Sequence, residues 1–146
     1  MKIELTQEQL ESLVKLVYLG NLMANAWRTR DVIKEYDDIE SLVLAAAAKH
    51  GLEDCVELDE SEKKYVPSAD LEEEMAEAVD FYDDNTFWDQ LVFRMADRDF
   101  GRKYGEDALD ELATEKGTER EKPLLDKYEK EFNEHGLDRL EIRRDN

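Results

Sequence analysis

The residues best suited to metal chemistry form a short acidic run, EEMAE at positions 73–77, followed closely by Asp80. Carboxylates three or four residues apart lie on one face of a helix, where they can share a divalent cation such as Mg²⁺. A catalytic magnesium site also needs ligands from a second element that meet the first in a sheltered cleft. The candidate metal ligands are therefore Glu73, Glu74, Glu77 and Asp80.

The run EEMAE resembles the first metal-binding motif, E-E-x-x-E, of the all-α nucleotide pyrophosphatases of the MazG and dimeric dUTPase type. In that family a later E-x-x-D motif on a neighbouring helix completes a magnesium site for a nucleoside triphosphate. In this chain the E-x-x-D motif, Glu77 to Asp80, overlaps the first motif instead of following it. The resemblance covers these few residues and implies a magnesium-dependent nucleoside triphosphate hydrolase as the alternative function.

Helical periodicity predicts that these carboxylates face water. The apolar stripe of the same segment consists of Leu71, Met75, Ala78 and Tyr82. On a wheel of about 100° per residue, Glu73, Glu77 and Asp80 fall nearly opposite that stripe. We therefore favour a solvated acidic face, and we expect no catalytic residue, metal centre or cofactor in the chain.

A second group that could do chemistry is the arginine stripe Arg94, Arg98 and Arg102. Residues four apart align along one edge of a helix, and guanidinium groups can clamp a phosphate or the carboxylates of a partner. The alternative is ion pairing within the chain, with Asp97 or Asp99 as the nearest acids. The excess of acidic residues favours this internal pairing.

Several predicted helices are apolar on two sides. The segment from Thr6 to about Trp27 carries one stripe that includes Leu10 and Val14, and another that includes Leu16 and Met23. A short chain with such helices has more apolar surface than one small domain covers, and a homodimer is the economical explanation. The candidate self-association residues are Trp27, Phe93 and Phe100.

The overall charge limits the choice of partner. The chain has 39 Asp and Glu against 20 Lys and Arg, a net charge of −19. This charge argues against binding nucleic acid, whose backbone is neutralised mainly by Lys and Arg, and it disfavours anionic membranes for the same reason. It would attract a basic protein partner.

Targeting signals and cysteine content favour the cytoplasm. The first residues do not form a secretory signal, and no apolar run is long enough to span a bilayer. The single Cys55 cannot form an internal disulfide, and its acidic neighbours disfavour a thiolate, so we expect an ordinary structural thiol.

The elements that must position these residues are helices. We predict an all-α fold, a single domain over residues 1–146, built as an irregular bundle of five to six helices. The expected helices cover about residues 7–27, 37–50, 68–84, 86–100 and 107–114. Gly117 and Thr118 separate these from a last helix that has Pro123 in its first turn and ends at His135 and Gly136. The segment 55–58 is expected as a short strand, and a minor strand pairing is expected near the termini, between residues 2–5 and 140–142.

The favoured function is that of a non-enzymatic, acidic interaction or regulatory protein that self-associates. The hydrolase is one alternative, and a protein that mimics the charge of DNA is another. A DNA mimic would array its carboxylates along one elongated surface. Here the acids are mixed with 20 bases and spread over several helices, which disfavours that reading.

Overall fold

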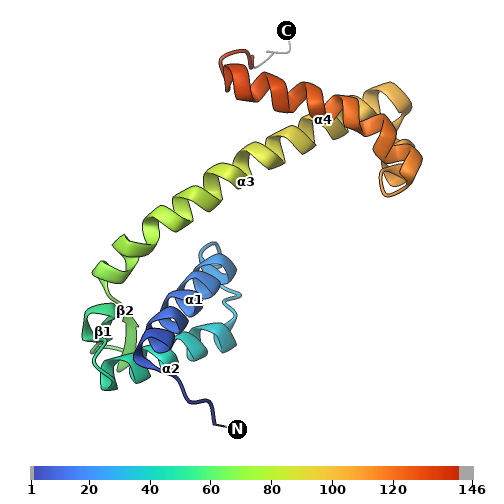
Figure 1. Ribbon diagram of the computed structural model, residues 1–146. Helices are drawn as coiled ribbons and strands as arrows, with labels where there is room; N and C mark the ends of the chain where they lie inside the picture. The colour runs from blue at the N-terminus through green and yellow to red at the C-terminus, as the bar shows by residue number, and fades with distance from the viewer. Residues whose placement is uncertain (1, 142–146) are drawn as a thin grey trace. The chain divides into compact units, whose positions relative to one another are not determined.

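The computed structural model describes residues 2–141, which form a helical chain with one short two-stranded sheet (Figure 1). The predicted all-α class with a minor strand pair is confirmed. Contacts group the chain into two compact units, residues 1–81 and residues 82–146. Helix α3 (Ala69–Tyr104) is continuous and contributes to both units. A single domain over the whole chain stays a prediction.

The first unit begins with α1 (Gln7–Asn25), whose start the sequence predicts correctly. The Thr6 hydroxyl accepts from the Gln9 backbone N–H at 3.2 Å, and the Gln9 side chain accepts from the Thr6 backbone N–H at 2.9 Å. This reciprocal capping box satisfies two N–H groups that have no partner within the helix. Helix α1 is uninterrupted through Gly20.

Helix α2 (Lys34–Lys49) packs beside α1 and begins earlier than the predicted cap at Asp37 (Figure 1). Its N-cap residue, Ile33, offers no side-chain hydrogen bond. Instead, Asn25 at the end of α1 binds Ile33, accepting from its N–H at 2.9 Å and donating to its carbonyl at 3.2 Å. The start of α2 is thus set by a tertiary contact.

The strand pair lies between α2 and α3 along the chain and not near the termini. After a short 3₁₀ turn, η1 (Glu53–Cys55), strand β1 (Val56–Asp59) pairs antiparallel with β2 (Lys64–Pro67). The strand predicted at 55–58 is confirmed with a shift of one residue. Residues 2–5 are not in a strand, and part of their predicted partner, Ile142, lies outside the described residues.

The core of the first unit joins α1, α2, the hairpin and the first turns of α3. Its buried members are Val14, Leu44, Ala47, Val56 and Leu71. Leu44 and Val14 have no exposed surface, and full burial of such a side chain stabilises by about 1.5 to 3 kcal/mol. Ser68 caps α3, accepting from the Leu71 backbone N–H at 3.1 Å, as the sequence predicts.

The predicted break at residues 84–86 is wrong, because α3 continues through it. A polar side chain interrupts a helix when it competes for nearby backbone groups. The Asp84 carboxylate instead accepts a hydrogen bond from the Trp88 indole N–H, one turn later, at 3.2 Å.

The second unit comprises the later part of α3, the 3₁₀ helix η2 (Glu106–Glu111) and α4 (Glu115–His135). Its core cluster is formed by Val92, Ala96, Tyr128 and Phe132. Helix α4 begins before Gly117, not after it as predicted, because the Thr114 hydroxyl accepts from the Gly117 N–H at 3.1 Å. Pro123 therefore lies inside the helix, while the predicted stop at Gly136 is confirmed by its φ of 54°.

Candidate functional site

The acidic run has the orientation that its periodicity predicts. Glu73, Glu77 and Asp80 are exposed, whereas Leu71 on the same helix is 1 % exposed. Ala78 and Tyr82, which the wheel places on the buried stripe, are exposed, because the stripe stays covered only over the first turns of α3.

One carboxylate of the run is engaged within the first unit. Glu74 accepts a hydrogen bond from the Lys15 ammonium at 2.5 Å, and Glu11 accepts from the same ammonium at 2.8 Å. These bonds, that of Glu11 first, raise the pKa of Lys15. No group of three or more His, Cys, Asp or Glu within residues 2–141 is placed to hold a metal ion.

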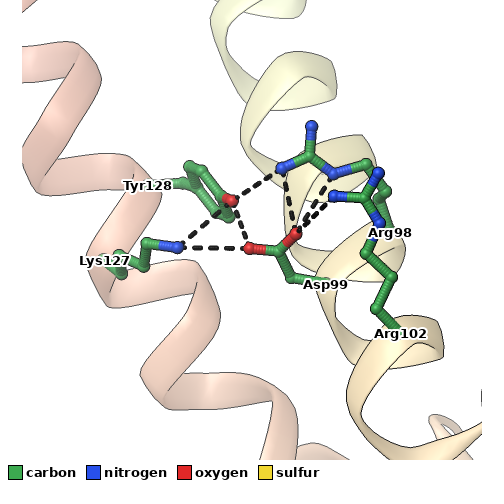
Figure 2. Close-up of polar contacts among 5 residues, drawn as sticks. All are labelled: Arg98, Asp99, Arg102, Lys127 and Tyr128. Atoms are coloured by element: carbon green, nitrogen blue, oxygen red, sulfur yellow. Dashed lines mark hydrogen bonds and ion pairs between the residues drawn. The ribbon is translucent and has the colours of Figure 1, made fainter.

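Two members of the arginine stripe turn toward one aspartate. Arg98 donates to the Oδ1 atom of Asp99 through Nη2 at 2.9 Å and through Nε at 3.1 Å (Figure 2). The Arg102 Nη1 atom lies 3.7 Å from the same oxygen. The internal pairing expected for this stripe is therefore present at Asp99. Arg94 is exposed and lines a separate pocket of about 380 Å³ with Phe87 and Leu91.

The other oxygen of Asp99 binds two residues of α4. The Lys127 ammonium donates to Oδ2 at 3.2 Å, and the Tyr128 hydroxyl donates to the same atom (Figure 2). Arg98 also donates to the Tyr128 hydroxyl oxygen at 3.0 Å. We call Arg98, Asp99, Arg102, Lys127 and Tyr128 the Asp99 cluster. It joins α3 to α4 beside the buried ring of Tyr128.

The charges of the cluster stabilise the contact between α3 and α4. The hydrogen bond from Tyr128 does most to lower the pKa of Asp99 to about 2, and Arg98 and Lys127 add to this effect against the opposing effect of burial. Three cations share one carboxylate that is 21 % exposed, so an external phosphate would have to displace Asp99. Lys127 and Tyr128 are site residues that sequence reasoning missed, because nothing in their local sequence marks a contact 28 or 29 positions away.

Replacing Asp99 with Asn should lower the free energy of unfolding by about 1 to 2 kcal/mol at neutral pH, because charged hydrogen bonds contribute about this much even where solvent screens the ion pairs. The pKa of Asp99 in the fold, about 2, lies below its ordinary value of 3.8. The stabilisation is therefore present above about pH 4 and lost as the pH falls toward 2. Urea unfolding at several pH values measures the difference.

The matched control is Asp89→Asn, which removes an exposed carboxylate from the same helix. We expect its unfolding free energy to change by less than about 0.5 kcal/mol. An Asp99→Asn variant as stable as this control at neutral pH would show that the cluster contributes nothing.

A different kind of surface runs along α1, which is apolar and exposed. Leu16 is 67 % and Met23 65 % exposed on α1, with Gly20 between them at helical spacing, and Trp27, in the turn that follows the helix, is 95 % exposed. We call these four residues the α1 stripe. Residues 16–27 contain no charged side chain, although 40 % of the chain is charged. The stripe lies on the side of the helix opposite the buried Val14.

The candidate self-association residues divide into two groups. Trp27 is almost fully exposed and Phe93 is 47 % exposed, so both can contact a partner. Phe100 has no exposed surface, and its ring packs against that of Tyr104 with centroids 4.7 Å apart. Phe100 is therefore a core residue of the second unit, and its assignment to an interface is wrong. The spacing of Phe100 from Phe93 places both on one side of α3. Leu109 of η2 lies beside Gly101, the neighbour of Phe100, so η2 lies near Phe100.

Cys55 has the environment expected of a structural thiol. Burial, followed by the charges of Glu11 and Glu74, raises the pKa of its thiol.

Within residues 2–141 there is no helix both long and apolar enough to cross a membrane. Comparisons of the chain with protein-family models, with curated proteins and with solved structures give no match.

Proposed function

We propose that this chain is a non-enzymatic interaction protein that self-associates, with the α1 stripe as the surface on which a second copy docks. The supporting observation is the exposure of Leu16, Met23 and Trp27 in a segment without charges. Contiguous exposed apolar surface of this kind is typical of protein interaction sites. Large aromatic side chains such as that of Trp27 are enriched among residues that dominate binding energy.

The form of the stripe suits a copy of itself. Gly20 lies near its middle, and apart from the adjoining backbone of α1 no atom of residues 2–141 lies within 4 Å of the position where a Cβ would stand. Two α1 helices that cross antiparallel at Gly20 can approach closely there, with Leu16 of one beside Met23 of the other. Such a contact is isologous, as in the commonest class of oligomer.

The charges at the ends of the stripe support the antiparallel orientation. Glu8 precedes it and Arg30 follows it, while Glu11 is paired with Lys15 and Arg28 with Asp31. An antiparallel pair brings the acids of one copy toward the bases of the other, and such complementarity sets orientation more than affinity. The excess negative charge of the chain lies outside residues 16–27. Repulsion between these charges on two copies opposes association, and added salt screens this repulsion.

Sedimentation equilibrium across micromolar concentrations tests this function. We expect a mass of twice the 17.1 kDa chain, with association strengthened by moderate salt. A mass of one chain throughout would contradict self-association. Hydrolysis of a nucleoside triphosphate with Mg²⁺, lost in Glu73→Ala or Glu77→Ala, would contradict a non-enzymatic function.

A further inference from the structure

Within residues 2–141, Glu40 on α2 is the buried ionisable side chain without a cation. It is 8 % exposed, and its Oε2 atom accepts a hydrogen bond from the Asn21 amide at 2.7 Å. No Lys or Arg among the described residues forms an ion pair with it. A buried carboxylate that stays charged needs a positive partner. Burial, and to a smaller extent Asp37, raises its pKa against the opposing effect of the Asn21 bond.

Glu40 lines a pocket of about 220 Å³ in the first unit. The polar side chains of its wall are those of Tyr18, Asn21, Asn25 and Glu40, and Leu22, Ala26 and Pro67 supply an apolar wall. The volume is below that of most drug-sized sites, so it suits a small ligand or the end of one side chain. The combination of one carboxylate and an apolar wall suits a molecule with a charged head and a short hydrocarbon tail.

The polar wall is held in place by a chain of hydrogen bonds. Asn25 binds both backbone groups of Ile33, and its Nδ2 also donates to the Asn21 Oδ1 atom at 2.7 Å. This bond orients the Asn21 amide so that its own Nδ2 points to Glu40. The pocket is therefore organised before any ligand enters, which lowers the cost of binding.

The charges around the pocket are negative. The pKa of the Tyr18 hydroxyl, on the pocket wall, is raised by burial and then by Glu72 and Glu40. Lys64 on the hairpin lies 3.2 Å from Asp37 and is engaged there. The ligand that complements this pocket is a cation.

We propose that this pocket binds a primary alkylammonium group, with the ammonium on the Glu40 carboxylate and the hydrocarbon along Leu22, Ala26 and Pro67. The same chemistry comes from a free amine or from a lysine side chain of a basic protein. The pocket uses other residues of α1 than the stripe, so this inference stands or falls independently of self-association.

Titration followed by NMR of the full chain tests the site. The probes are butylammonium, its neutral counterpart 1-butanol, and Nα-acetyl-lysine methylamide. We expect butylammonium to give saturable shifts at Asn21, Asn25 and Glu40, and 1-butanol to give none. Saturable binding of the lysine derivative as well assigns the site to lysine side chains, and binding of butylammonium alone assigns it to free amines.

The decisive variant is Glu40→Gln, which keeps an oxygen that can accept from Asn21 and removes the charge. We expect butylammonium affinity to fall about tenfold or more, while the melting temperature stays equal to or above that of the unaltered chain. Asp37→Asn is the matched control and should change affinity much less. Absence of saturable binding by both amines, or equal affinity in the unaltered chain and Glu40→Gln, would overturn the proposal.

Discussion

Replacing Gly117 with alanine is expected to lower the free energy of unfolding of the second unit by about 3 kcal/mol, as overpacking of a closed site does. An added Cβ would lie 2.0 Å from the Glu111 carbonyl oxygen and 2.8 Å from the Leu112 Cα. Both are backbone atoms, so the clash is relieved only by moving the turn between η2 and α4. Urea unfolding followed by far-UV circular dichroism measures the loss.

The turn around Gly117 explains why no side chain is tolerated. The Thr114 hydroxyl accepts from the Gly117 N–H, and the Thr118 hydroxyl donates to the Leu112 carbonyl at 3.2 Å. These bonds hold the first turn of α4 against the end of η2. Moving the turn would lengthen both, so the alanine variant loses hydrogen bonds as well as packing.

Gly101→Ala is the matched control, because it adds the same methyl group to a helical glycine of the same unit. Its nearest neighbour would be a Leu109 methyl at 3.8 Å, which is ordinary contact. Alanine is the better helix former, so we expect this variant to gain about 0.5 to 1 kcal/mol. Equal unfolding midpoints for the two variants would show that the close approach at Gly117 is not present in solution.

Replacing Met23 with aspartate should convert the self-associated protein to single chains. Docking of a second copy would bury an unpaired carboxylate of the α1 stripe beside Leu16 of that copy, a loss of about 3 kcal/mol or more in association. That is a weakening of more than about a hundredfold. Because Met23 is 65 % exposed in the single chain, the unfolding of that chain should change little.

Leu42→Asp is the matched control for Met23→Asp. Leu42 is equally exposed, at 65 %, but lies on α2 and outside the stripe. We expect this variant to sediment as the unaltered chain does. If both variants dissociate, repulsion from added charge is responsible; if neither does, the α1 stripe is not the interface.

Local signals in the sequence determined several of the helix ends. Thr6 with Gln9, Ser68, and His135 with Gly136 mark ends that the structure confirms, because a cap is formed by atoms within a few positions of one another. The spacing of apolar residues also divided α1 into two stripes, and packing buries the one that contains Leu10 and Val14. A helix buries one whole face, and the spacing of apolar residues along the sequence determines which residues share a face.

Tertiary structure decided the features that depend on atoms distant in sequence. Asn25 sets the start of α2, which lies before the predicted start of this helix at residue 37. Glu40 is buried and accepts a hydrogen bond from Asn21. Asp84 accepts a hydrogen bond from the Trp88 indole and does not end a helix. Each of these polar side chains has several local uses of similar energy, and the packing around it selects one.

The candidate sites follow the same division. Four-residue spacing alone aligned Arg98 with Arg102, but only the packing of α4 on α3 brought Lys127 and Tyr128 to Asp99. The pattern around residue 73 determined that its carboxylates face water, since periodicity is local. The burial of Glu40 in a pocket without a cation was decided by the meeting of α1, α2 and the hairpin, because the low dielectric and the wall of that pocket exist only when these elements pack together.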